Sequence, residues 1–136
     1  MKLTYLKRVA IAQIIAAVVN AEGGIGPMSG EECTPNGDEF ELESQMGVFP
    51  ASVGEDGRIH QDEESLEERY SDMQNDMDYT DEEMEEEFGT VEDFVNENAS
   101  KDIEEYMSPE NGWFGADSKI EEKALELIKL IMKTKR

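Results

Sequence analysis

The sequence predicts a small, mainly α-helical domain, and three observations lead to that expectation. The chain has 136 residues, which allows one small domain at most. Apolar residues recur at helical spacing in 1–21, 62–107 and 108–136, whereas 22–61 is rich in turn-forming residues. We therefore expect the N- and C-terminal helices to pack together as the core and to display acidic helical segments outward.

The chain is strongly acidic, and the acidic residues are concentrated in its middle. It has 34 Asp and Glu against 12 Lys and Arg, a formal net charge of −22 and a pI of about 4.1. Residues 22–117 hold 31 of the acids and 3 of the bases, whereas 1–21 and 118–136 each carry +3. Nucleic-acid phosphates and anionic membranes repel such a chain, so we expect neither as a direct partner.

Residues 1–21 have two interpretations. An apolar run over 9–19 follows three basic residues and is followed by Asn20 and Ala21, as in a secretory signal peptide cleaved after Ala21. The run is too short for a membrane span, which needs about 20 apolar residues. The alternative is an amphipathic helix that stays in the protein, because its branched apolar residues fall on one helical face. Those residues are Ile11, Ile14, Ile15, Val18 and Val19.

Residues 22–61 predict turns and at most a small β-hairpin. Phe40 and Leu42 alternate with acidic residues, as in a half-buried strand. Val48 and Phe49 precede Pro50, an arrangement typical of an edge strand. A hairpin alone is only marginally stable in water, so an extended arm lying over a partner is the alternative.

The sequence shows no set of residues for catalysis or for a cofactor. One Cys and one His cannot form a zinc site of the usual type. His60 lies alone among acids, and Cys33 is expected to be a free thiol or, in a secreted chain, to form an intermolecular disulfide. EF-hand spacing occurs over 72–83, but Met77 stands where the loop requires glycine. We expect no enzymatic activity, no cofactor and no metal site.

Residues 62–107 predict several short helices with narrow apolar seams and broad acidic faces. Thr80 with Glu83 forms a capping box that begins a second helix, and Gly89 ends it. Thr90 begins a third helix. The apolar seams of the four helices are, in chain order, Leu66, Tyr70, Met73 and Met77; Met84 and Phe88; Val91, Phe94 and Val95; and Ile103, Tyr106 and Met107.

The acidic segment has the charge density of a nucleic-acid strand if it is straight. As one helix, residues 62–93 would span roughly 48 Å at about 1.5 Å per residue. Their 16 carboxylates would give one charge per roughly 3 Å, close to the spacing of about 3.4 Å along one DNA strand. The segment is therefore a candidate phosphate mimic, and a plain solvated acidic surface is the alternative.

Residues 108–136 predict an aromatic loop followed by the strongest helix signal in the chain. Trp113 and Phe114 either plug the base of the domain or anchor a partner. Ser118 with Glu121 predicts a capping box, and the helix that follows has an apolar face and a basic end. This layout resembles the broad plan of virus scaffolding proteins, an acidic helical body with a basic C-terminal helix, although no motif is shared.

These features predict a non-enzymatic interaction protein that binds a basic protein surface, in its strongest form as a nucleic-acid mimic. One alternative is a structural or assembly subunit of a larger complex such as a virion, docked through its terminal helices. Both functions fit a location in the cytoplasm or within a larger assembly. The third candidate is a secreted acidic protein. The predicted partner-binding residues are Glu63, Glu64, Glu67, Glu68, Asp72, Met73, Asp76, Met77, Glu82, Glu83, Met84, Glu86, Glu87, Phe88, Trp113 and Phe114.

Overall fold

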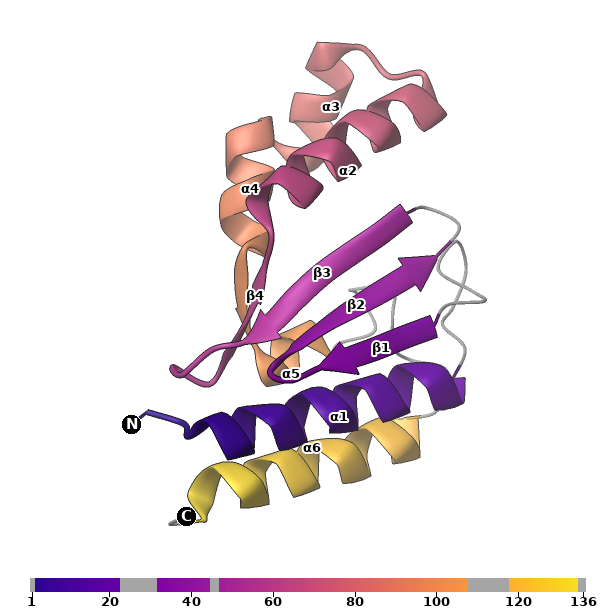
Figure 1. Cartoon of the computed structure of the whole chain (residues 1–136). Helices are drawn as coiled ribbons and strands as arrows, with labels where there is room; N and C mark the ends of the chain where they lie inside the picture. The colour runs from indigo at the N-terminus through magenta and orange to yellow at the C-terminus, as the bar shows by residue number, and fades with distance from the viewer. Residues whose placement is uncertain (1, 23–31, 45–46, 108–117, 135–136) are drawn as a thin grey trace.

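A five-stranded antiparallel sheet lies at the centre of the part of the chain that the structure describes (Figure 1). This computed structural model describes residues 2–22, 32–44, 47–107 and 118–134. The strands lie in the sheet in the order in which they occur along the chain. They are β1 (Glu32–Asn36), β2 (Glu39–Ser44), β3 (Gly47–Val53), β4 (Arg58–Gln61) and β5 (Ser100–Asp102).

Helices lie at two opposite ends of this sheet (Figure 1). The first and last helices run side by side beneath it, and three acidic helices stand above it. A single helical turn, α5, follows the last strand and packs beside the sheet. The helices are α1 (Tyr5–Glu22), α2 (Glu63–Met77), α3 (Asp81–Phe88), α4 (Val91–Asn98), α5 (Ile103–Tyr106) and α6 (Ser118–Lys133).

The predicted mainly α-helical fold is wrong, because the molecule is α+β. Residues 22–61 contain four paired strands, where the sequence predicted at most a small hairpin. Two of the predicted turn formers lie at corners of this sheet. Gly37, with φ 65°, closes the connection between β1 and β2, and Gly57, with φ 78°, lies between β3 and β4. Glycine adopts this left-handed backbone without a steric cost.

The strand that carries Pro50 has two neighbours over only part of its length. β4 pairs with β3 through Ala51, Ser52 and Val53, so at Pro50 the described neighbour of β3 is β2 alone. The backbone N–H of Val53 donates to the carbonyl of Asp38, so the Val53 nitrogen points toward β2. Backbone nitrogens along a strand point alternately to the two neighbouring strands, and the nitrogen of Pro50, three residues earlier, therefore points away from β2. The proline therefore removes no hydrogen bond from this pair of strands.

One face of the sheet is apolar and buried, and the other is exposed and acidic over β1 and β2. The register places Cys33, Leu42 and Phe49 opposite one another and Phe40 opposite Ala51, and all five are buried. The alternate residues of β1 and β2 point to the opposite face, because successive side chains of a strand alternate. Their exposed acids, which we call the sheet-face glutamates, are Glu32, Glu39, Glu41 and Glu43.

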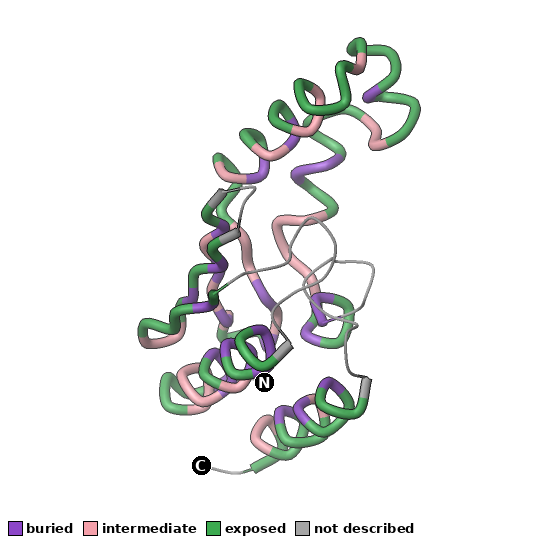
Figure 2. The backbone as a smooth tube through the Cα atoms, turned by 90° about the vertical axis from the view of Figure 1, so that its right-hand side faces the viewer, coloured by how far each residue is buried: buried purple, intermediate pink, exposed green. Residues whose placement is uncertain are grey.

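α1 is buried on two sides, between the sheet and α6. Ile11, Ile15 and Val19 have no exposed surface, and one apolar cluster joins them to the sheet and to Ala124 and Ile128 of α6. Figure 2 shows the buried residues of both helices on their inward sides. The Lys7 ammonium donates to the carbonyl of Thr134, so the start of α1 lies beside the end of α6. The two helices are therefore antiparallel neighbours.

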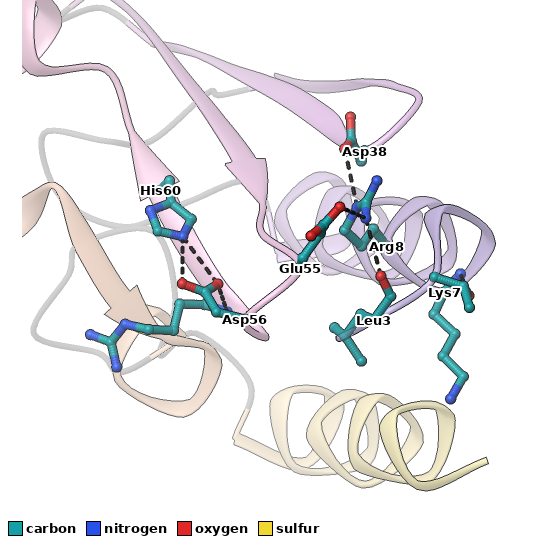
Figure 3. A network of polar contacts seen from close by, with 9 residues as sticks. Leu3, Lys7, Arg8, Asp38, Glu55, Asp56 and His60 are labelled. Atoms are coloured by element: carbon teal, nitrogen blue, oxygen red, sulfur yellow. Dashed lines mark hydrogen bonds and ion pairs between the residues drawn. The ribbon is translucent and has the colours of Figure 1, made fainter. Parts of the chain in front are cut away.

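Arg8 ties the start of the chain to two turns of the sheet (Figure 3). Its guanidinium lies 3.2 Å from an Asp38 oxygen and 3.7 Å from a Glu55 oxygen, and it donates to the carbonyl of Leu3 at 3.1 Å. The backbone N–H of Leu3 in turn donates to the carbonyl of Glu55 at 2.8 Å. The Arg8 side chain is only 13% exposed, whereas the side chain of Glu55 is 58% exposed, so the bond to Asp38 is the better shielded of the two ion pairs.

Asn20 covers the open edge of the sheet at one point. Its side-chain amide donates to the carbonyl of Cys33 at 2.9 Å and accepts from the Cys33 N–H at 2.7 Å. These are the two backbone groups of Cys33 that point away from β2 in the ladder. The Asn20 amide therefore takes the place of a neighbouring strand near the start of β1, where an unpaired edge would invite association with other chains.

Replacing Asn20 by Ala is expected to lower the free energy of unfolding by about 1–3 kcal/mol, because it leaves the Cys33 N–H and C=O without their partner. The matched control is Gln13→Ala, an exposed polar residue on the same helix, which should change stability by less than about 0.5 kcal/mol. Urea denaturation followed by circular dichroism measures both. Equal stability of the two variants would contradict the edge-capping role.

Candidate functional site

The acidic helices form a lobe inserted between two adjacent strands. β4 leads into it and β5 leaves it, and these strands pair through Ile59 and Lys101. At its base the N–H of Gln61 donates to the carbonyl of Ala99 at 2.8 Å, and the Gln61 side chain donates to the carbonyl of Asn98 at 2.9 Å. We call residues 62–98, which contain α2, α3 and α4, the acidic lobe.

A small apolar cluster of its own holds the acidic lobe together. Leu66, Tyr70, Met84, Phe94 and Val95 are its buried members, one or two from each helix. The rings of Tyr70 and Phe94 lie 5.5 Å apart, and the Tyr70 hydroxyl donates to the carbonyl of Gly89 at 2.7 Å. This hydrogen bond joins α2 to the connection between α3 and α4. The first two residues of the seam predicted on α2, Leu66 and Tyr70, therefore point into the lobe.

The ends of the short helices follow the sequence signals closely. Thr80 and Glu83 form the predicted capping box of α3, and Gly89 lies at its C-terminal cap, so both predictions are confirmed. Thr90 caps α4, as predicted, and Asp93 completes a second capping box. Acidic residues occupy the first turn of all three helices, where the helix dipole favours negative charge.

The lobe does not form the straight acidic rod on which the charge-density prediction depended. Asp78 adopts the left-handed conformation, with φ 54°, and ends α2 there. The chain then reverses into α3 before α4 begins (Figure 1). The Gln74 amide holds this reversal by donating to the carbonyl of Tyr79 and to Asp81. The hydrogen bond between Tyr79 and Glu87 raises the pKa of the tyrosine hydroxyl.

Carboxylates nevertheless line up along α2. Glu64, Glu68, Asp72 and Asp76 are spaced four residues apart, so they form one row with steps of about 6 Å. Glu63 and Glu67 lie beside this row. Like charges at this helical spacing destabilise a helix by roughly 0.2–0.5 kcal/mol per pair. The row is therefore a local cost to folding that packing elsewhere offsets.

Every acidic side chain of the lobe is exposed. Residues 62–98 contain 17 acids and a single base, Arg69, and all 17 acids lie at the surface. The ion pairs between described residues all lie outside the lobe. Arg69 is half-buried, with its guanidinium carbon 5.4 Å from the centre of the Phe49 ring, and burial lowers the pKa of this group. Its charge is therefore directed toward the sheet and not toward the acidic surface.

The structure separates the predicted apolar contacts from the predicted acidic ones. Met84 is fully buried, so it cannot supply the surface contact that the sequence predicted. Met73 and Phe88 are half-buried against the lobe's core, and Met77 is 36% exposed. All predicted acidic members are exposed: Glu63, Glu64, Glu67, Glu68, Asp72, Asp76, Glu82, Glu83, Glu86 and Glu87. The predicted anchors Trp113 and Phe114, and the side chain of Ser118, lie outside the described residues.

Sequence reasoning missed two acidic surfaces. One is an open groove of about 630 Å³ between α3 and α4, which Glu87, Phe88, Asp93 and Glu97 help to line. The other is the set of sheet-face glutamates. The alternation of acids with Phe40 and Leu42 was the available signal for the second surface. No local pattern reports the groove, because it depends on how two helices pack.

The single histidine of the chain pairs with a carboxylate at the surface. His60 lies 3.1 Å from both oxygens of Asp56, and both side chains are well exposed (Figure 3). Desolvation acts to raise the pKa of Asp56, but the hydrogen bond from His60 and bonds to backbone N–H groups outweigh it and lower that pKa. In the described ranges, no three His, Cys, Asp or Glu side chains converge on a metal position. Residues 72–77 of the EF-hand pattern are helical in α2.

Cys33 faces the apolar side of the sheet. Its side chain is 3% exposed, and burial raises the pKa of the thiol to about 12. A thiol with such a pKa is almost entirely protonated near neutrality and is a poor nucleophile. In the folded protein this residue contributes packing, and its burial does not favour the intermolecular disulfide considered for a secreted chain.

Comparisons of the chain with protein-family models, with curated proteins and with solved structures find no match. Among the described helices, none combines the length and apolar character needed to cross a bilayer.

Replacing Glu68 by Gln is expected to stabilise the protein at low salt. The change removes two like-charged pairs, with Glu64 and Asp72, and should raise the free energy of unfolding by roughly 0.4–1 kcal/mol. In about 1 M NaCl, where the Debye length is only about 3 Å, the gain should largely vanish. Glu97→Gln, with one like-charged neighbour at Asp93, should give a smaller gain. A gain that does not depend on salt would contradict a repulsive row.

Cys33 is expected to react slowly with a thiol reagent in the native protein and rapidly in denaturant. At pH 8 a pKa of about 12 leaves a thiolate fraction of about 10⁻⁴. Because Cys33 is the single cysteine, the labelling rate at increasing urea reports directly on exposure of the sheet's buried face. Equal labelling rates in the native and unfolded protein would show that this face is not protected.

Proposed function

We propose that the protein is a non-enzymatic binding protein that applies its acidic lobe to a basic surface of another protein. The observation that carries this proposal is the exposure of all 17 lobe carboxylates with no ion pair among the described residues. Lysine and arginine side chains of a partner are the groups that such a surface attracts. The lobe has its own apolar cluster, which fixes the positions of these carboxylates.

The repulsion within the lobe supports this function. Like-charged pairs four residues apart occur along both α2 and α3, and each weakens its helix. A basic partner placed over these rows replaces repulsion with attraction, so relief of the repulsion adds to the free energy of binding. Charge of one sign on an exposed surface also steers a partner of the opposite sign and accelerates association.

The strongest form of the proposal is a nucleic-acid mimic. The six carboxylates of α2, from Glu63 to Asp76, span about 20 Å, or one charge per roughly 3–4 Å. This is comparable with the spacing of about 3.4 Å along one DNA strand. α2 alone reaches this charge density, without a straight segment of 32 residues. The exposed part of Met77 at the end of this helix offers an adaptable apolar contact.

We also propose that residues 1–21 are retained in the working protein, which then acts in the cytoplasm or within a larger assembly. The burial of Ile11, Ile15 and Val19 and the contact of Asn20 with the sheet edge support retention. Cleavage after Ala21 would remove one side of the core. The intact mass of the protein from its native source tests this proposal, and a mass short by residues 1–21 would overturn it.

The binding proposal is tested with two variants of identical charge. The lobe variant replaces Glu64, Glu68, Asp72 and Asp76 by their amides, and the sheet variant replaces the four sheet-face glutamates by Gln. Each is immobilised and exposed to basic proteins that were enriched on heparin. We expect the lobe variant to retain about tenfold less protein than the wild type, and the sheet variant to differ by no more than about twofold.

Salt and DNA then distinguish the alternatives. A mimic should lose its partner between about 50 mM and about 500 mM NaCl, because electrostatic attraction is screened. A short DNA duplex should compete for the same partner. A partner that stays bound at high salt and is not displaced by DNA would instead support an assembly subunit docked through apolar helices. Equal losses by the two variants would show that net charge alone, and not the acidic lobe, binds the partner.

A further inference from the structure

α6 has a second apolar side that its own fold does not bury. Its inner side holds the buried residues Ala124 and Ile128, which pack toward α1 and the sheet. On its outer side, Leu127 is 47% and Leu130 63% exposed. A surface helix needs only one apolar stripe to pack on its own domain. The outer stripe is therefore unexplained by the folded monomer.

α1 extends this exposed apolar surface. Leu6 is 76% exposed, and the contact of Lys7 with Thr134 places the first turn of α1 beside the end of α6. Leu6 and Leu130 therefore lie at the same end of the antiparallel pair. In Figure 2 the exposed sides of both helices face away from the sheet. We call this surface, which Leu6, Ile120, Leu127 and Leu130 define, the terminal-helix face.

The charge distribution indicates what can approach the terminal-helix face. α6 carries four lysines against three glutamates, and the chain up to the end of α1 has three bases against Glu22 alone. The acidic lobe stands at the opposite end of the molecule, across the sheet (Figure 1). Repulsion between two copies of a chain with a net charge of −22 is therefore smallest when they meet at this face. Each copy then holds its lobe away from the other.

The charges along α6 also favour one orientation of two such helices. Glu126 and Lys133 are seven residues apart and thus lie on the same side of the helix, next to Leu130. In an antiparallel pair, Leu127 of one helix meets Leu130 of the other. Glu126 of each copy then lies near Lys133 of the other. The antiparallel arrangement therefore brings opposite charges together beside the leucines.

We propose that the protein forms a twofold-symmetric dimer through the terminal-helix face. α1 and α6 of the two copies pack as a four-helix arrangement, with the two α6 helices antiparallel across the axis. Such an interface is isologous, so it closes at two copies and does not propagate into a filament. The two acidic lobes point outward at opposite ends of the dimer, which is therefore a bivalent binder when the lobe has a partner.

Sedimentation velocity from about 1 µM to about 100 µM tests this dimer with the full-length chain. The expected result is a species of twice the monomer mass of 15.3 kDa. The double variant Leu127→Gln and Leu130→Gln should raise the dissociation constant by about tenfold or more. The matched control changes two apolar residues of similar exposure elsewhere, Val48→Gln and Val91→Gln, and should remain dimeric.

Charge reversal tests the orientation without changing an apolar residue. Glu126→Lys and Lys133→Glu should each weaken the dimer, and the two changes together should restore it, because opposite charges again face each other. Slow labelling of Cys33 shows that each variant is folded. A wild-type chain that is monomeric throughout the concentration range overturns the proposal. So does a dimer that survives the leucine variant or that the valine control also dissociates.

Discussion

The structure depends on the burial of α1 from two sides. Leu, Ile, Val and Phe make up only 28 of the 136 residues, so the chain cannot build separate cores for its sheet and its C-terminal helix. α1 serves both, because it is apolar over most of its surface and contacts the sheet through one side and α6 through another. Asn20 and Arg8 fix its two ends to the sheet by hydrogen bonds and ion pairs. Without this helix the sheet would have neither its cover nor its edge partner.

The main apolar core combines α1, the sheet and α6, and the acidic residues of the lobe are not needed to form it. Most carboxylates of the lobe serve no described bond. Asp62, Glu83 and Asp93 cap helices, and Asp81 and Glu87 bond to residues of the reversal between α2 and α3. The main apolar core at one end of the molecule thus carries a charged surface at the other end, and the repulsion within that surface weakens the helices of the lobe. The same division explains the overall polarity of the molecule, with its basic residues gathered near α1 and α6. In the proposed functions, electrostatic attraction drives binding of a partner at the lobe, and burial of apolar surface drives association at the terminal helices.

The sequence could predict what is decided within one or two turns of chain. Thr80 with Glu83, Gly89 and Thr90 mark helix ends by local hydrogen bonds and backbone freedom, and these predictions were correct. The sheet was missed because its pairings join residues that local patterns do not connect. Ser100–Asp102 is a short polar strand that is defined only by its pairing with β4. Met84 shows the same limit at the candidate site. Helical spacing placed it on an apolar seam, but only the packing of α2, α3 and α4 together decides that this seam is buried. The straight acidic rod failed at Asp78, where a single left-handed residue reverses the chain.

The position of the lobe has a consequence for how this protein can diversify. The chain enters the lobe at Gln61 and returns at Ala99, and these two residues are hydrogen-bonded to each other. Topologically, the three helices therefore replace the turn of a β-hairpin. Insertions at such a turn leave the strand order and the surrounding core unchanged. Selection can thus lengthen, shorten or exchange the lobe as one module while the scaffold is inherited intact.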